Sequence, residues 1–390
     1  MDPSFRLERL TLARFRSYEA LALHLNAPVA LFVGPNGAGK TNLLEAVSLL
    51  APGRGLRGAR LADLARRDLG GTAGGAWAVA GRFATPLGPL DLGTSMADGE
   101  PARRTFLLDG TPAKSQAEVA ARVAMVWLTP QLGGLFQEGA AERRRFLDRL
   151  VWALEPQHAR ELAAYERALA ERNRLLAAGR ADPAWLAGLE DALARHGVAV
   201  AAARRALIAA LNRTLARCVA GDFPRAQLAC ACPWAEALDR DPALVVEDAL
   251  RKRLAEDRSC DAEAGTTRSG PHRADLCLTQ VETGMPAQLC STGEQKALLV
   301  SVVLAQAALI AEARGFGPIL LLDEVAAHLD PLRREALFET LARLPSQVLL
   351  TGTEAAPFAP LAGRAEAFAV EAGRVTAMPF GPAQRRRAAL

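Results

Sequence analysis

Apolar and polar positions alternate with different periods along this chain, and its first part has the pattern of an α/β protein. Residues 6–12 alternate with a period of two, which predicts an edge strand with residues 21–25 as its partner. Residues 29–33 predict a buried strand, and residues 40–50 have the spacing of a helix. Residues 70–108 place short apolar segments among Gly, Pro and Thr, which predicts a small antiparallel sheet with long turns.

The middle of the chain, residues 140–217, is dominated by Ala, Leu, Arg and Glu, with apolar residues at helical spacing. Pro156 and the pair Asp182-Pro183 interrupt this pattern, so it predicts a packed helical lobe rather than a long coiled coil. After residue 275, apolar runs at 319–322 and 347–350 alternate with helical segments, which implies a parallel sheet.

Composition adds the cellular setting. The chain has 390 residues, of which half are hydrophobic, and its net charge of +4 permits nucleic-acid binding without arguing for it. The apolar stretch 297–311 is too short to span a bilayer comfortably and predicts a buried core helix. Six cysteines without a CxxC pair, and a charged N-terminus without an apolar signal core, predict a cytoplasmic protein.

A phosphate-binding loop is the most specific motif. The sequence GPNGAGKT matches GxxxxGK[ST] and lies between the predicted strand 29–33 and the helix that follows it. Glycine allows the backbone to wrap around phosphates, the lysine reaches the β- and γ-phosphates of ATP, and the threonine hydroxyl binds Mg²⁺. The predicted nucleotide-binding residues are Gly34, Pro35, Asn36, Gly37, Ala38, Gly39, Lys40 and Thr41.

An acidic pair follows the predicted strand 319–322. In the sequence LLLDE, Asp323 is predicted to hold Mg²⁺ together with Thr41, and Glu324 to orient or deprotonate the water that attacks ATP. Most of the chain separates this pair from Lys40, so one site is expected to form from the two ends of the sequence.

A serine-glycine loop precedes the apolar stretch 297–311. It reads CSTGEQK and resembles the signature of ABC ATPases, with Cys290 in place of the usual leucine. The resemblance implies that Ser291, Thr292, Gly293 and Glu294 reach the terminal phosphate of ATP held by a second copy of the chain. Ser291 and Glu294 also have the spacing of a helix capping box, a purely structural alternative. The position of the loop shortly before Asp323 favours the signature.

Local matches outside these motifs identify the chain as similar to the RecF family of bacterial recombination-repair ATPases, from Leu7 to Val375. They are FRSYE at 15–19, GRGLRGAR at 53–60, LTPQ at 128–131 with RRRFLDRL at 143–150, and SGPHRADL at 269–276. The implied fold is α/β: an ABC/SMC-head-like P-loop ATPase with an antiparallel β subdomain and an inserted α-helical lobe. The expected parts are residues 1–130 and 271–380 as the two halves of the ATPase domain, 131–270 as the helical lobe, and 381–390 as a basic tail.

The resemblance also implies a function. Such proteins use ATP and Mg²⁺, form ATP-dependent homodimers, bind double-stranded DNA near single-strand gaps, and help to load RecA together with RecO and RecR. They hydrolyse ATP slowly, stimulated by DNA, as a release switch, and no membrane is involved.

Further residues are candidates by position. By resemblance to ABC ATPases, Gln131 is expected to help hold Mg²⁺ or the attacking water, and Asp330 belongs to a segment that resembles the D-loop of the dimer seam. Thr353 is a candidate sensor of the γ-phosphate. Arg54, Arg57 and Arg60 form a basic stretch among glycines, and Arg143 begins an arginine triplet at a predicted helix start. These four arginines are candidate contacts to DNA phosphates.

Other readings stay open at this point. An ABC transporter subunit would have a shorter interval between phosphate loop and signature, and an SMC-like clamp would need a longer, unbroken insert. A nucleotide-gated scaffold that does not hydrolyse ATP would not need Glu324.

Overall fold

The computed structural model describes residues 4–66, 75–96, 104–179, 182–218 and 223–381. The chain forms two compact units. The first unit contains residues 1–133, 218–223 and 299–390, and the second contains residues 134–217 and 224–298. The predicted basic tail lies outside the described residues except for residue 381.

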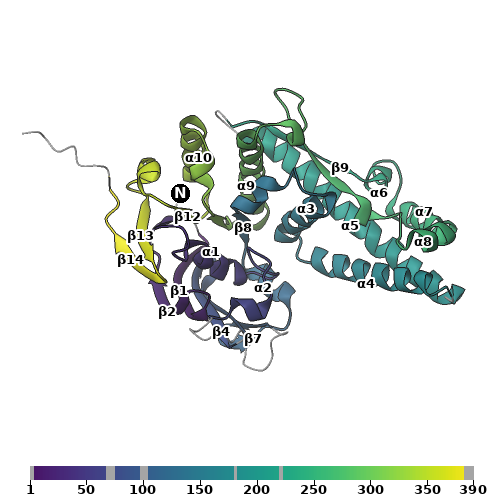
Figure 1. The fold of residues 1–390 in the computed structure, drawn as a ribbon, viewed down its shortest axis with the longest axis horizontal. Coiled ribbons are helices and arrows are strands. Elements are labelled where there is room, and N and C mark those ends of the chain that lie inside the picture. Colours follow the sequence, from purple (N-terminus) through teal and green to yellow (C-terminus); the bar gives the residue numbers. More distant parts are fainter. Residues whose placement is uncertain (1–3, 67–74, 97–103, 180–181, 219–222, 382–390) are drawn as a thin grey trace, which may run out of the picture. The chain divides into compact units, whose positions relative to one another are not determined.

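A mostly parallel sheet forms the centre of the first unit (Figure 1). Its strands, in spatial order, are β14 (Arg374–Met378), β13 (Ala365–Glu371), β3 (Val29–Val33), β12 (Val348–Gly352), β11 (Ile319–Leu322) and β8 (Met125–Leu128). All pairs are parallel except β13–β14. Every residue of β3, β8, β11 and β12 is buried, and all of them are apolar except Thr351 of β12. The predicted strands 29–33 and 319–322 are confirmed, whereas the strand predicted at 347–350 begins one residue later and ends two residues later, at Gly352.

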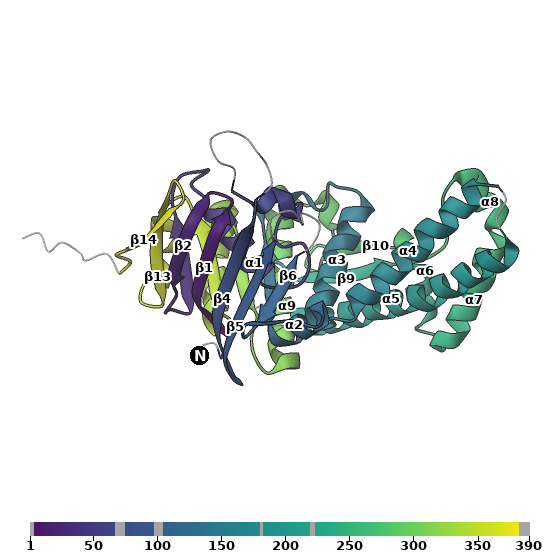
Figure 2. The ribbon, with the colours of Figure 1, turned by 90° about the horizontal axis from the view of Figure 1, so that it is seen from below.

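An antiparallel sheet belongs to the same unit, and its strands lie side by side in Figure 2. In spatial order they are β2 (Tyr18–His24), β1 (Arg6–Phe15), β4 (Trp77–Thr85), β5 (Gly88–Met96), β6 (Thr105–Leu108) and β7 (Thr111–Pro112). The prediction of an edge strand at residues 6–12 is wrong, because β1 pairs with both β2 and β4. Its period of two reflects one buried face, which an interior antiparallel strand also has.

Helices complete the first unit. They are α1 (Lys40–Leu49), α2 (Gln116–Arg122), α10 (Pro331–Arg343) and part of α9 (Thr292–Arg314). Helix α1 contacts β1, β4 and β12, so the helix that follows the phosphate loop is anchored on both sheets. Among the described helices, α9 alone is long and apolar enough to cross a bilayer, but 67% of its most apolar window is buried in the protein, as expected of a core helix.

The second unit is mainly helical. It contains α3 (Ala140–Leu154), α4 (His158–Ala177), α5 (Pro183–Cys218), α6 (Pro233–Ala237), α7 (Ala243–Glu256) and α8 (Arg258–Ala264), with the antiparallel pair β9 (Ala226–Ala231) and β10 (Asp275–Gln280). Tyr165 of α4, Leu193 of α5 and Leu250 of α7 share one buried core, which confirms a packed lobe. Residues 271–298, predicted in the ATPase half, pack in this unit, and the division falls within α9.

Short single-turn helices connect these elements. They are η1 (Leu61–Leu64), η2 (Pro130–Gly134), η3 (Pro271–Arg273), η4 (Ala287–Leu289), η5 (Val325–His328) and η6 (Ala356–Leu361).

Candidate nucleotide-binding site

The phosphate loop lies between β3 and α1 in the first unit. Gly37 and Gly39 have φ of 81° and 112°, a region that favours glycine. A Cβ on Gly39 would lie 2.7 Å from the Ser17 hydroxyl and 2.9 Å from that of Tyr18, so no other residue fits there. The Tyr18 hydroxyl donates a hydrogen bond to the Gly39 carbonyl at 3.0 Å, which holds the loop in place.

Lys40 is 4% exposed and lies under the curve of this loop. Its Nζ donates hydrogen bonds to the carbonyls of Gly34 at 2.7 Å and Pro35 at 3.0 Å. The same Nζ lies 3.8 Å from Oε1 of Glu324. The two ends of the sequence therefore meet at this ammonium group.

The acidic pair lies at the carboxyl end of β11. Parallel pairing aligns Leu322 of β11 with Leu128 of β8 and Leu350 of β12, so these strands end at one edge of the sheet. The buried Asp323 accepts a hydrogen bond from Thr41 Oγ1 at 3.1 Å. Burial raises the pKa of Asp323, and the hydrogen bonds from Thr351 and Thr41 act in the opposite direction.

Thr351 is a site residue that sequence reasoning missed. Its hydroxyl donates to Asp323 Oδ1 at 2.7 Å and accepts from the Glu324 N–H at 2.8 Å. Glu324 has φ of 52°, an uncommon backbone conformation for a residue with a side chain. The predicted Thr353 is exposed and makes no hydrogen bond to a described residue, so its role at the γ-phosphate stays a prediction.

The FRSYE segment and the segment GRGLRGAR both support α1. Arg16 binds the buried Glu45 of α1 through two hydrogen bonds of 2.8 and 2.9 Å. Arg57 donates to Asn42 at 2.9 Å and to Glu45 at 3.3 Å. These contacts use only Nη1 of Arg57, whose side chain is 37% exposed, so its contact with DNA stays a prediction. Arg54 and Arg60 are exposed and remain predictions.

The signature loop belongs to the second unit. The backbone N–H and the hydroxyl of Ser291 both donate to Glu294 Oε2, at 2.9 and 2.7 Å, and the Glu294 N–H donates to Ser291 Oγ at 3.4 Å. The structure therefore contains the capping box at the start of α9. Ser291 and Thr292 are also exposed, and Gly293 is partly exposed. Their contact with ATP in a second copy stays a prediction.

The remaining candidates have local roles. Asp330 caps α10 by accepting a hydrogen bond from the Arg333 N–H at 2.9 Å. Gln131 is exposed in η2, shortly after β8. Arg143 makes a two-bond ion pair with Asp275, at 2.7 and 2.8 Å, and donates to the Glu138 carbonyl. Its guanidinium is thus used inside the second unit, which removes the reason to propose it as a DNA contact.

The donor set fits Mg-ATP. The buried Asp323 carboxylate and the Thr41 hydroxyl are hard oxygen ligands of the kind that Mg²⁺ takes alongside phosphates and water. Such a site needs one carboxylate, and no group of three or more His, Cys, Asp or Glu suited to a metal occurs among the described residues. Lys40 and the N-terminus of α1 supply the positive charge that phosphates require.

The two sheets and this site together place the chain in the ABC/SMC-head class of P-loop ATPase folds. The family model described as the RecF/RecN/SMC N terminal domain matches residues 6–368. A DNA replication and repair protein RecF of Mesorhizobium japonicum is 46% identical over 378 residues, 96% of this chain and 98% of the relative. The RecF protein of Agrobacterium fabrum is 46% identical over 380 residues, 97% of this chain and 100% of the relative.

Solved structures agree on the fold. A structure of the recombination mediator RecF with ATPrS has a TM-score of 0.84 at 22% identity and covers 97% of this chain and 99% of that one. An Smc head domain from Pyrococcus furiosus has a TM-score of 0.51 at 15% identity, with 96% of each chain covered. The chain belongs to the RecF family of DNA replication and repair proteins, as its motifs predicted.

Proposed function

We propose that this chain is an ATP-dependent DNA-binding protein of recombination repair. It dimerises on ATP, binds duplex DNA near single-strand gaps, and helps to load RecA together with RecO and RecR. Slow, DNA-stimulated hydrolysis of ATP then releases the dimer. The single observation that carries the proposal is the meeting of Lys40, Thr41, Asp323 and Glu324 at one end of the parallel sheet.

Each residue of this group has a chemical role in the proposal. Lys40 binds the β- and γ-phosphates, and the loop amides and the start of α1 bind the others. Thr41 and Asp323 hold Mg²⁺, which when bound neutralises charge on the phosphate oxygens. Glu324 orients the attacking water and takes its proton.

The proposed dimer is tested by sedimentation with and without ATP. We expect ATP to convert the parent to a dimer and Ser291→Arg to remain monomeric, because a large cation would occupy the space of the terminal phosphate. The variant should still bind ATP as a monomer, measured with a fluorescent nucleotide. An ATP-induced dimer of Ser291→Arg would contradict the role of the signature loop.

Thr351→Val is expected to lower kcat for ATP hydrolysis about tenfold or more, with little change in KM. The hydroxyl joins Asp323 to the backbone of Glu324, so its loss leaves Asp323 with the Thr41 hydrogen bond alone and removes the acceptor of the Glu324 N–H. Thr351→Ser should restore turnover. Thr340→Val, which removes a hydroxyl bonded within α10, is the matched control. Parent-like kcat in Thr351→Val would show that the orientation does not matter.

The DNA role is supported by family membership and by the names of the relatives, which are DNA replication and repair proteins. Retention of a gapped duplex by the protein, dependent on ATP and weakened by salt, is the direct test. A gapped duplex should also accelerate turnover, whereas an ungapped duplex should do so less. The proposed compartment is the cytoplasm, where bacterial DNA is repaired.

A further inference from the structure

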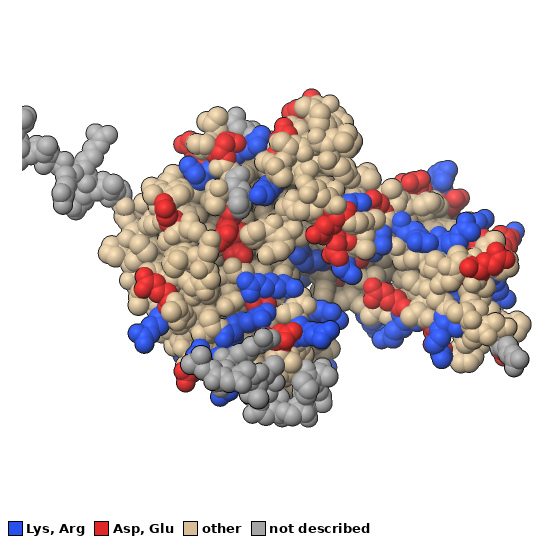
Figure 3. Space-filling model, in the orientation of Figure 1, with Lys and Arg blue, Asp and Glu red and all other residues tan. Residues whose placement is uncertain are grey.

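A pocket of about 210 Å³ lies within the second unit, between α3, α4, α5 and η3. Its lining includes Arg144 and Arg145 of α3, Arg204 of α5, and the pair Tyr165 and His272. At roughly 30 Å³ per water, it has room for a tetrahedral oxyanion and several waters. On the face drawn in Figure 3, basic and acidic side chains are interspersed over the helices of this unit. Many arginines of this unit therefore have a carboxylate nearby, and an arginine that lacks one is the better indication of an anion-binding site.

Arg144 is the arginine of this pocket without a counter-charge. Its guanidinium is half-buried and donates to the Ala274 carbonyl at 2.7 Å. Among the described residues, no carboxylate lies within 4.0 Å of it. Burial lowers the pKa of Arg144, and the nearby positive charges of Arg204 and Arg273 lower it further. Arg204 is itself paired with Asp148, so Arg144 and the exposed Arg273 are the positive charges here that an anion could balance.

The carboxylates that attract Arg144 from a distance are already bound. Asp275 is held by Arg143 through two hydrogen bonds of 2.7 and 2.8 Å. Asp148 is held by Arg204 through two hydrogen bonds of 2.7 Å, and it also contacts His158 at 2.9 Å. Each of these two carboxylates is thus bound by another cation, although both still raise the pKa of Arg144 from a distance.

His272 lines one side of the pocket with an uncharged imidazole ring. Its Nε2 lies 2.8 Å from the Thr267 carbonyl, which can only accept, so Nε2 carries the proton. Nδ1 then accepts from the Tyr165 hydroxyl at 2.6 Å. Burial lowers the pKa of His272, in agreement with a neutral ring. A Cβ on Gly270, whose φ is 140°, would lie 2.2 Å from the Tyr165 oxygen, so this close approach requires glycine.

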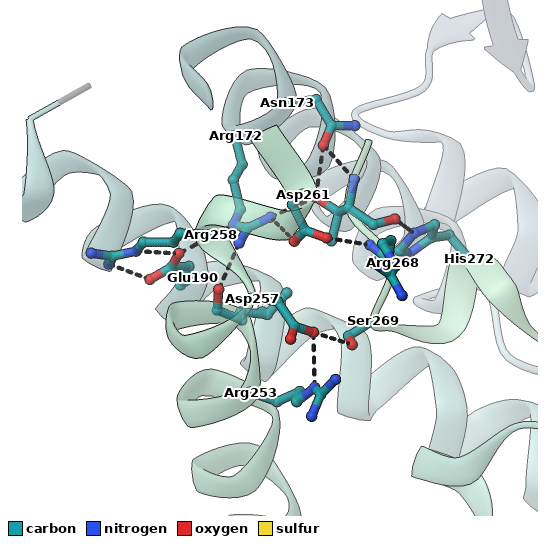
Figure 4. Close-up of polar contacts among 12 residues, drawn as sticks. Arg172, Asn173, Glu190, Arg253, Asp257, Arg258, Asp261, Arg268, Ser269 and His272 are labelled. Atoms are coloured by element: carbon teal, nitrogen blue, oxygen red, sulfur yellow. Dashed lines mark hydrogen bonds and ion pairs between the residues drawn. The ribbon is translucent and has the colours of Figure 1, made fainter. Parts of the chain in front are cut away.

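Several hydrogen bonds hold the loop behind this wall, as Figure 4 shows. Thr267 receives a hydrogen bond from the buried Arg172 at 2.7 Å and donates to Asn173 at 2.7 Å. Ser269 donates to Asp257 at 2.9 Å, and the Arg268 N–H donates to Asp261 at 3.0 Å. A rigid wall lowers the entropy cost of ordering a ligand in the pocket.

We propose that this pocket binds a phosphate group of the DNA backbone, with Arg144 as its principal ligand, the exposed Arg145 of the lining beside it, and Arg273 next in the chain after the lining residue His272. Arg145 is 73% exposed and pairs only with its helix neighbour Glu142, so it can turn toward a phosphate. Arg273 is exposed and makes no ion pair to a described residue. The inference rests on the proposed binding of duplex DNA and assigns part of it to the SGPHRAD segment and α3.

The test compares duplex affinity, by fluorescence anisotropy, of Arg144→Gln and the parent. Arg144→Gln is expected to bind about tenfold more weakly, because it loses a charge-assisted hydrogen bond. The slope of log K against log salt should become shallower by about one, the change expected for the loss of one phosphate contact. Glu166→Gln, which removes the exposed carboxylate of the lining, should bind more tightly. Arg174→Gln, which removes an equal charge elsewhere on α4, should leave the affinity unchanged.

A second arm separates DNA from free phosphate. With the nucleotide site already filled by Mg-ADP, inorganic phosphate should raise the melting temperature of the parent above that in chloride of equal ionic strength, and should not do so for Arg144→Gln. If phosphate stabilised the parent but not Arg144→Gln, and Arg144→Gln still bound the duplex like the parent, the pocket would bind free phosphate and not a phosphate of DNA. Parent-like behaviour in both arms would overturn the pocket. A parent that binds no duplex would overturn the proposed function, while the phosphate arm would still report on the pocket.

Discussion

Glu324→Gln is expected to lower ATP turnover by at least about a hundredfold while ATP binding persists, because glutamine keeps the shape of the side chain and cannot accept the proton of the attacking water. Glu324 lies 3.8 Å from Lys40, its backbone N–H is held by Thr351, and its side chain is 30% exposed at the end of β11. It is thus both fixed and accessible. Single-turnover hydrolysis and sedimentation measure the two consequences, and the variant should remain a dimer for as long as ATP is present.

Glu354→Gln is the matched control for this prediction. Glu354 is exposed three residues after Thr351, and its side chain makes no hydrogen bond or ion pair to a described residue, so its loss should leave turnover at the parent rate. Parent-like turnover by Glu324→Gln would assign the base to another group. A collapse of nucleotide binding in Glu324→Gln would instead give Glu324 a structural role next to Lys40.

The sequence was sufficient wherever a site element is continuous along the chain. The phosphate loop, the strand before it and the helix after it lie within 21 consecutive residues, Val29 to Leu49, and each has a local signal. The same holds for β11 and the acidic pair that follows it. Local hydrogen bonding and hydrophobic period decide such segments, so a single sequence predicts them well.

Lateral contacts could not be predicted with the same certainty. Thr351 reaches Asp323 only because β12 lies beside β11 with Leu350 opposite Leu322, and strand order does not follow from the sequence of either strand. Arg143 pairs with Asp275, which lies 132 residues away in the chain. The sequence alone shows only an arginine triplet, and nothing in it indicates that Arg143 forms an ion pair within the protein. Knowing that parallel strands end at one edge would have brought Thr351 into consideration. No comparable signal identifies the partner of Arg143.

Arg172→Met is expected to destabilise the second unit by about 3–5 kcal/mol, because it leaves buried carboxylates without their cation. Arg172 is fully buried and donates to Glu190 at 3.2 Å, to Asp261 at 2.8 Å and to the Leu254 carbonyl at 2.6 Å. Glu190 keeps Arg258 as a partner, but no other described cation pairs with Asp261. Figure 4 shows that this one guanidinium joins α4 to α8 and to the segment after it.

Native-state hydrogen exchange is the suitable measurement, since it reports the free energy of opening of the second unit separately from the first. Arg174→Met, at an exposed position two residues further along α4, should leave protection unchanged. Removing the orphaned charge as well, in Arg172→Met with Asp261→Asn, should recover much of the loss, because the penalty comes from an unpaired buried charge rather than from a missing attraction. Protection in the double variant as low as in Arg172→Met alone would assign the loss to packing instead. Both variants also lose the hydrogen bond from Arg172 to Thr267, which lies behind the wall of the proposed phosphate pocket, so both should bind phosphate more weakly than the parent.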